Sequence, residues 1–298
     1  MHNKSWNGKL YICEILLIAA AVFTGCSQRR GEKGPEGAEY PESGEENSGI
    51  RIEIVDSSET KIQERETVSQ LTPFEKTVCP GDILDKEAIE EIGISELFTI
   101  SSIDSDIFER MNGNSYKEGC PVPPEDLRYV RILHYDFEGN IRVGELVCNQ
   151  SVSDDLLRIF KRLYDAEYPV EKVRLIDDYG GDDGLSSSDN NTSCFNYRTV
   201  AGSSSLSRHA LGTAIDINPL YNPYITRDEQ GEIHCAPAGG APYMDRSQNF
   251  PFKIDEEDLC CQLFIEEGFT WGGSWKNRPD YMHFSRGTTP EGGGLENQ

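Results

Sequence analysis

The chain has 298 residues, of which 27% are charged and 37% hydrophobic, and its formal net charge at pH 7 is −24. So acidic a chain offers no basic surface for phosphate groups, which excludes nucleic acid as a partner. The charge otherwise favours solubility, and nothing in the sequence indicates an oligomer.

The first 26 residues have the features of a bacterial lipoprotein signal. Two lysines give a positive start, and residues 15–24 are an apolar run too short to span a bilayer comfortably. The run ends at Gly25-Cys26, and such signals are cut before a Cys that carries the lipid. An ordinary secretory signal and an uncleaved anchor are the alternatives. All three place the rest of the chain outside the cytoplasm, and the first predicts a lipid anchor on Cys26 at the outer face of the cytoplasmic membrane.

The segments on either side of the central region are predicted to be disordered. Residues 27–74 and 289–298 are rich in Gly and Glu and have almost no large apolar side chains. Such segments cannot bury enough apolar surface to offset the entropy lost on ordering. We therefore expect residues 75–288 to form the folded domain, and residues 27–74 to tether it to the membrane.

The central region mixes predicted strands and helices. Residues 129–137 and 141–147 predict a hairpin, because β-forming residues flank a Glu-Gly-Asn turn. Apolar periodicity predicts a helix capped by Ser153 and a second helix from a cap at Asp255 to Glu267. Short strands are predicted at 173–176, 214–217 and 281–285. The elements do not alternate as βαβ units do, which favours an α+β fold with a mostly antiparallel sheet and flanking helices.

Two features of this region stay open at the level of sequence. Residues 177–192 are a polar segment rich in Gly, Ser and Asp, which predicts a loop of a length that is typically functional or mobile. Seven of the nine cysteines follow Cys26, so at least one thiol stays unpaired if disulfides form within the chain. No two have C-x-x-C spacing, so a structural zinc cluster is not indicated, and Cys260 is expected on the buried face of its helix.

Two segments offer residues that bind metals. His209 and Asp216 lie in the first segment, and Asp280 and His283 lie in the second. Catalytic zinc usually takes three protein ligands of these kinds and keeps a fourth position for water. The sequence therefore predicts one zinc per chain, held by His209, Asp216 and His283. Asp280 is then free to take a proton from the attacking water without ligating the metal.

The local pattern explains how these side chains meet. Gly212 permits a tight turn after His209. Side chains alternate along the strand at 214–217, so the isoleucines on either side of Asp216 face the core while Asp216 faces the site. In the second segment Phe284 is expected to face the core beside His283. Each ligand also has an ordinary structural alternative, but the whole set, with Arg198 nearby, favours a metal site.

The remaining polar and aromatic candidates are less specific. His134 in the hairpin and His234 in a polar loop have no such context and are expected to be structural or surface residues. The Trp-Gly-Gly-Ser-Trp run of 271–275 allows close backbone approach and two indoles that could wall a pocket. Core packing of Trp271, with Trp275 as a lid over the sheet, is the equal alternative.

The ordered motifs resemble the VanY-like D-alanyl-D-alanine carboxypeptidase family. That family includes L-alanyl-D-glutamate endopeptidases and shares its fold with the hedgehog signalling domain. The resemblance covers 195–286 and rests on the following motifs: Arg198, Ser207-x-His209, Gly212-x-Ala214-x-Asp216, Trp271-Gly-Gly-x-Trp275 and Asp280-x-x-His283-Phe284.

The resemblance implies a hedgehog/DD-peptidase-like fold and a role for each site residue. It implies zinc on His209, Asp216 and His283, with Asp280 as general base. Arg198 would match the family arginine that binds substrate and stabilises the developing oxyanion, and Ser207 a serine that contacts substrate. Trp271 and Trp275 are further candidates for substrate binding.

The sequence thus predicts a zinc metallopeptidase acting on peptidoglycan stem peptides, with D-alanyl-D-alanine carboxypeptidase as the first choice. An L-alanyl-D-glutamate endopeptidase, a peptidase of free peptides and a non-catalytic, zinc-stabilised module that binds wall peptides are the alternatives. Asp280 and Arg198 favour an enzyme, because a binding module has no need of a base and an oxyanion partner beside its metal. The predicted tether favours a fixed polymer as substrate.

Overall fold

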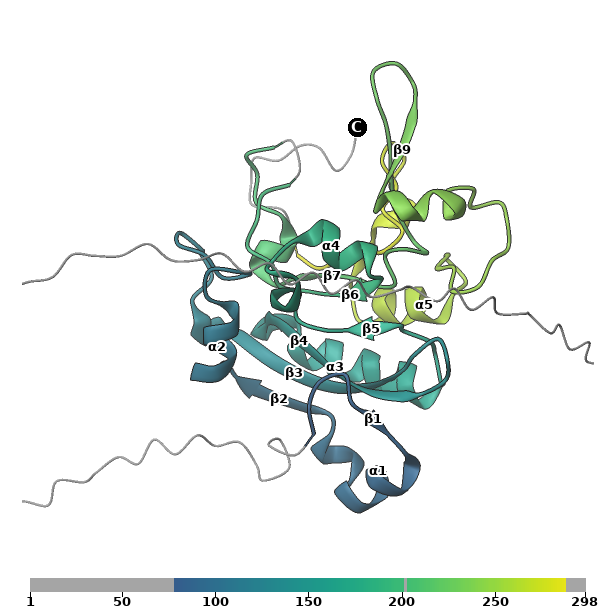
Figure 1. The fold of residues 1–298 in the computed structure, drawn as a ribbon. Helices are drawn as coiled ribbons and strands as arrows, with labels where there is room; N and C mark the ends of the chain where they lie inside the picture. Colours follow the sequence, from purple (N-terminus) through teal and green to yellow (C-terminus); the bar gives the residue numbers. More distant parts are fainter. Residues whose placement is uncertain (1–77, 201–202, 288–298) are drawn as a thin grey trace, which may run out of the picture. The chain divides into compact units, whose positions relative to one another are not determined.

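The computed structural model describes residues 78–200 and 203–287, which all belong to one compact unit of the chain (Figure 1). The predicted signal with Cys26, the predicted tether and the predicted tail lie outside the described residues. Among the helices of the described part, none has the length and apolar character needed to cross a membrane.

The largest sheet is antiparallel and has the strand order β1-β4-β3-β2. Its long central pair is the predicted hairpin, in which Leu127 pairs with Asn149 and Tyr135 pairs with Ile141. The hairpin prediction is confirmed, although the first arm lies two residues earlier than predicted and the second arm ends two residues later. The strands of this sheet are β1 (Ile83–Leu84), β2 (Thr99–Ser102), β3 (Leu127–Tyr135) and β4 (Ile141–Asn149).

Helix α3 (Gln150–Asp165) follows β4 directly and packs against the sheet (Figure 1). Its buried apolar side chains are those that the periodicity predicted, namely Leu156, Ile159, Phe160 and Leu163. The predicted cap was wrong, because Asn149 caps the helix by accepting a hydrogen bond from the Ser151 amide at 3.0 Å. Ser153 lies buried inside the helix. Asn caps a helix as well as Ser does, and Asn149 stands where β4 ends.

A second, smaller antiparallel sheet has the order β10-β11-β7. Its strands are β7 (Ala214–Asp216), β10 (Thr270–Trp271) and β11 (His283–Ser285). Ile215 and Phe284 are fully buried and share one hydrophobic core with α3 and the large sheet. The small sheet is therefore anchored from its apolar side.

The described part also contains two further strand pairs, four shorter α-helices and several 3₁₀ helices. The pairs are the parallel β5 (Lys172–Val173) and β6 (Asn191–Thr192), and the antiparallel β8 (Tyr224–Arg227) and β9 (Ile233–Ala236). The helices are α1 (Lys86–Ile92), α2 (Ser105–Met111), α4 (Asp183–Ser188) and α5 (Leu259–Glu266). This arrangement confirms the α+β class with mostly antiparallel sheets.

The segment 177–192 is ordered into elements, so the prediction of an irregular loop was wrong. A 3₁₀ helix (Ile176–Tyr179) precedes α4, and β6 follows it. The side chain of Asp182 caps α4 by accepting from the Leu185 amide at 2.9 Å. The predicted strand at 173–176 ends at Val173, because the 3₁₀ helix begins at Ile176.

Helix α5 begins later than predicted. Its cap is Asp258, which accepts from the Cys260 amide at 2.9 Å, in place of the predicted Asp255. Four consecutive acidic residues, 255–258, each offered a capping carboxylate, and packing of the helix into the core decides among them. Cys260 is fully buried, as expected, and the seven cysteines of the described residues are free thiols.

Candidate metal centre

The small sheet places two of the predicted ligands side by side. His283 on β11 pairs directly with Asp216 on β7, and the next pair is Phe284 with Ile215. Phe284 and Ile215 are fully buried in the core, so the preceding pair points to the opposite face. The alternation predicted for both strands is confirmed.

The third predicted ligand comes from the turn that leads into β7. His209 lies in a 3₁₀ helix (Arg208–Leu211) that is capped by Ser207 and ends at Gly212. Gly212 has φ of 68°, and a Cβ there would lie 2.6 Å from the Asn149 amide nitrogen. Only glycine meets both conditions, so Gly212 fixes the tight turn that directs His209 toward the strand pair.

The three side chains present a compact set of ligand atoms. His209 Nε2 lies 3.2 Å from His283 Nδ1 and 3.3 Å from Asp216 Oδ2, and His283 Nδ1 lies 3.1 Å from Asp216 Oδ1. Zinc bonds of about 2.0–2.1 Å in tetrahedral geometry require ligand atoms roughly 3.3 Å apart. The spacing and the chemistry of the donors therefore fit a zinc ion.

The hydrogen bond of the other ring nitrogen of His209, Nδ1, also supports a zinc site. His209 Nδ1 lies 2.7 Å from the carbonyl oxygen of Cys194, an acceptor, so Nδ1 carries the proton and donates it. In the neutral ring, Nε2 then presents a lone pair to His283 and Asp216. A carbonyl in this position orients a ligating imidazole and fixes its tautomer. This contact could not be predicted from the sequence, because every residue type has a backbone carbonyl.

Charge in the centre favours a bound cation. His209 and His283 hold the pKa of Asp216 well below its usual range, although burial alone would raise it. Burial lowers the pKa of His209, but the charge and hydrogen bond of Asp216 raise it more, and the net shift is upward. The Asp216 carboxylate thus favours a proton on the His209 ring, and a metal ion would displace it.

Asp280 is placed beside the ligands and is not one of them. The group that fits a metal contains His209, Asp216 and His283. Asp280 Oδ1 is buried and has no hydrogen-bond partner among the described residues. Burial raises the pKa of Asp280 to about 7, an effect that the charges of His283 and Arg198 oppose. A carboxyl with a pKa near neutrality suits a general base.

Gly272 sets the position of Asp280. The Asp280 amide donates to the Gly272 carbonyl at 3.0 Å. A Cβ on Gly272 would lie 2.6 Å from the Asp280 carbonyl oxygen and 3.3 Å from the His283 Cβ. The glycines of this run were expected to admit a ligand; Gly272 instead admits the backbone that carries Asp280.

Arg198 lies at the rim of the centre. Its carbonyl accepts from the Ser207 amide at 3.1 Å, and its charge lowers the pKa of both Asp280 and His209. Arg198 Nη2 pairs with Asp183 Oδ2 at 2.6 Å, while Arg198 Nε is buried without a partner among the described residues. Unpaired buried polar atoms on Arg198 and Asp280 mark places that a ligand would complete.

The remaining substrate-binding candidates have different surroundings. Ser207 caps the helix of His209, so its hydroxyl already has a structural role, and its contact with substrate stays a prediction. Trp271 is 5% exposed in the core, and its Nε1 donates to the Tyr281 carbonyl at 3.0 Å, which is the structural alternative. Trp275 is partly buried, with its ring centre 5.5 Å from that of His283. Trp275 can therefore wall the site.

Neither of the two other histidines in the described part belongs to the centre. His134 is buried with Nδ1 2.7 Å from the Val170 carbonyl oxygen, and burial lowers its pKa to about 4. His234 is exposed and lies 2.9 Å from Asp228. These positions match the structural and surface roles expected for them.

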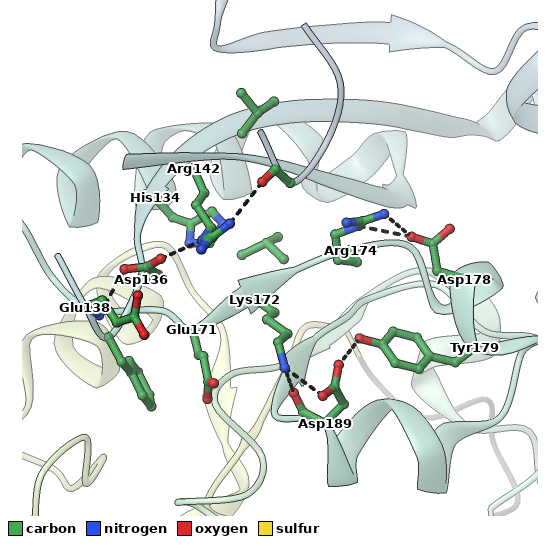
Figure 2. A pocket seen from close by; sticks show the side chains of 14 residues that line it. His134, Asp136, Glu138, Arg142, Glu171, Lys172, Arg174, Asp178, Tyr179 and Asp189 are labelled. Carbon is green, nitrogen blue, oxygen red and sulfur yellow. Dashed lines mark hydrogen bonds and ion pairs between the residues drawn. The ribbon is translucent and has the colours of Figure 1, made fainter. Parts of the chain in front are cut away.

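A cavity of about 510 Å³ lies apart from the metal ligands, next to the turn of the β3–β4 hairpin and β5 (Figure 2). Its lining includes none of the predicted site residues. Its cations are paired within the protein, as Arg142–Asp136 at 2.5 Å, Lys172–Asp189 at 2.6 Å and Arg174–Asp178 at 2.6 Å. The arginine and lysine side chains that line this cavity are thus already paired with carboxylates of the protein.

Comparison with known proteins bears on the same region. Residues 201–286 match a family model described as D-alanyl-D-alanine carboxypeptidase. The match contains His209, Asp216, Asp280 and His283 and begins after Arg198. Neither the curated proteins nor the solved structures contain a match to this chain. The family match confirms the resemblance that the motifs indicated.

Proposed function

We propose that this chain, whose residues 201–286 match the D-alanyl-D-alanine carboxypeptidase family model, is a zinc peptidase of peptidoglycan stem peptides. The observation that carries the proposal is the convergence of ligand atoms from three side chains, with spacings of 3.1–3.3 Å, beside the separate carboxyl of Asp280, whose Oδ1 is buried. The terminal D-alanyl-D-alanine bond is the proposed substrate. The hedgehog/DD-peptidase-like fold rests on the same family match.

The roles of the side chains follow from their positions. His209, Asp216 and His283 would hold the zinc, which when bound polarises a carbonyl and lowers the pKa of water. Asp280 Oδ1 accepts the proton of the attacking water and passes it to the leaving amine. Arg198 offers a guanidinium to a substrate carboxylate or to the oxygen on which negative charge develops.

Two features support catalysis over a binding module. Structural zinc sites are closed by four protein ligands, whereas the metal-binding group found among the described residues has three. Asp280 Oδ1 is buried without a partner among the described residues, which costs folding free energy, so its presence beside the three side chains supports a chemical use.

We also propose that the enzyme is a lipoprotein, anchored through Cys26 at the outer face of the bacterial cytoplasmic membrane. The support is the apolar run that ends at Gly25-Cys26, followed by the predicted tether at 27–74. A tether lets an anchored enzyme reach a fixed polymer such as the cell wall.

The test is digestion of purified muropeptides with pentapeptide stems by the full-length protein in detergent, with products identified by mass spectrometry. The proposal predicts loss of the terminal alanine, and no reaction after chelation of zinc. Cleavage between L-alanine and D-glutamate would support a zinc peptidase and contradict the terminal D-alanyl-D-alanine bond as its substrate. Binding without any product would contradict catalysis and favour the binding module.

A further inference from the structure

Arg198 is held by a residue that the sequence did not single out. Asp183 is the first residue of α4, in the segment 177–192, whose role could not be predicted from the sequence. Its Oδ2 lies 2.6 Å from Arg198 Nη2. The carboxylate therefore reaches the rim of the metal centre from an element that precedes the family motifs in sequence.

The helix that carries Asp183 is fixed from behind. Gly181, just before it, has φ of 74°, and a Cβ there would lie 2.8 Å from the backbone of Asn114. Ser186 is 1% exposed, and its hydroxyl accepts from Asn191 Nδ2 at 3.0 Å. The close approach at Gly181 and the buried contact of Ser186 leave α4 little freedom to shift.

Asn196 connects this helix to the metal ligands. It is 2% exposed, and its amide donates to the carbonyl of His209 at 3.0 Å. Its side-chain Nδ2 donates to the Gly181 carbonyl at 3.3 Å and lies 3.5 Å from Asp183 Oδ1. The turn before α4 and the helix of His209 are thus joined through one buried residue, by its side chain and its backbone amide respectively.

The ion pair is poorly suited to a purely structural role. The side chains of Arg198 and Asp183 are 28% and 43% exposed, and pairs at such positions contribute little to folding. The contact with Asp183 uses one guanidinium nitrogen, and Nε has no partner among the described residues. A flexible arginine would thereby be held in one orientation with donors left for a ligand.

We propose that Asp183 is a positioning residue, which holds the Arg198 guanidinium in the orientation that receives the substrate's carboxylate or carbonyl oxygen. This inference rests on the proposed function, because it assumes that Arg198 contacts the substrate. The proposal also assigns a role to the segment 177–192, which places the Asp183 carboxylate against the Arg198 guanidinium.

The test compares kcat and KM of the full-length protein on pentapeptide muropeptides for Asp183→Asn, Asp183→Glu and Asp189→Asn. Asp189 is the matched control, because it also forms a 2.6 Å ion pair on a partly exposed side chain, with Lys172. We expect Asp183→Asn to lower kcat/KM by about five- to tenfold, mainly through KM, as one charge-assisted contact is lost. Asp183→Glu should recover part of this, and Asp189→Asn should match wild type.

A double-mutant cycle shows whether Asp183 acts through Arg198. In the Arg198→Gln background, Asp183→Asn should have no further effect. An undiminished effect there, or wild-type kinetics of Asp183→Asn, would overturn the inference. A gain in activity would also overturn it, since it would mean that Asp183 competes with the substrate for the guanidinium.

The two proposals fail in different ways. If the wild-type protein hydrolyses muropeptides but Asp183→Asn behaves as Asp189→Asn does, only the role of Asp183 is wrong. If the wild-type protein hydrolyses none, the proposed function is wrong. Muropeptide affinity measured for the same variants then decides on Asp183, with the same five- to tenfold weakening expected.

Discussion

Replacing Gly272 by alanine tests the packing that sets the position of Asp280. The new Cβ would lie 2.6 Å from the Asp280 carbonyl oxygen and 3.0 Å from the Asp280 Cβ. An ordinary contact begins at about 3.4 Å, so the two segments must separate by roughly 0.8 Å. Forced overpacking of this kind costs about 1–3 kcal/mol of folding free energy. A misplacement approaching 1 Å at a reacting group lowers the rate by about 10- to 100-fold.

We therefore expect Gly272→Ala to retain zinc, to melt several degrees lower and to lose about 10- to 100-fold in kcat/KM on muropeptides. Gly239→Ala is the matched control, because its Cβ would meet only the end of the Leu220 side chain, at 3.0 Å. Differential scanning calorimetry, metal analysis and kinetics measure the three quantities. Wild-type melting and kinetics for Gly272→Ala would refute the claim that close packing fixes Asp280.

Three further predictions concern the metal, the protonation of Asp280 and the anchor. Chelation should remove one zinc per chain together with activity, and His209→Ala should abolish zinc occupancy while His134→Ala keeps it; full occupancy in His209→Ala would exclude the assigned ligands. Because burial raises the pKa of Asp280 to about 7, the metal-free protein should lose stability as pH rises from about 4 through 7. The melting temperature of metal-free Asp280→Asn, relative to that of the wild type, should therefore be higher at pH 8 than at pH 5. An equal difference in melting temperature at both pH values would contradict this. A raised carboxyl pKa means that, between these pH values, the folded state holds a proton on Asp280 that the unfolded state has lost. Cys26→Ala should accumulate as an unprocessed precursor without lipid; a mature N-terminus well beyond Cys26, with the protein free in the medium, would contradict the anchor.

The convergence of His209, Asp216 and His283 could be predicted from sequence, because local rules determine much of its geometry. Strand alternation separates Asp216 from its buried neighbour Ile215, and the need for a left-handed residue after His209 is visible as Gly212. The pairing of His283 with Asp216 then requires only that the two strands be neighbours. Residue type and short spacing carry the local part of this information, and the pairing of the two strands carries the rest.

The supporting contacts depend on tertiary structure and could not be predicted. The Cys194 carbonyl that orients His209 belongs to the backbone, and Asp183 resembles its acidic neighbours until α4 brings it to Arg198. The predicted first residues of two helices were wrong for a related reason. Asn149 and Ser153, like Asp255 and Asp258, are equally good caps in isolation, and packing into the core selects between them.

The most direct test of the account is the effect of Asp280→Asn on zinc content and on muropeptide hydrolysis in the same preparation. The amide keeps the shape of the side chain but cannot accept the proton of the attacking water, and general-base catalysis typically contributes about 10²–10⁴-fold. The account predicts one zinc per chain and a fall in hydrolysis of that order. A variant that keeps its zinc and hydrolyses muropeptides at the wild-type rate would contradict the assignment of Asp280 as the base.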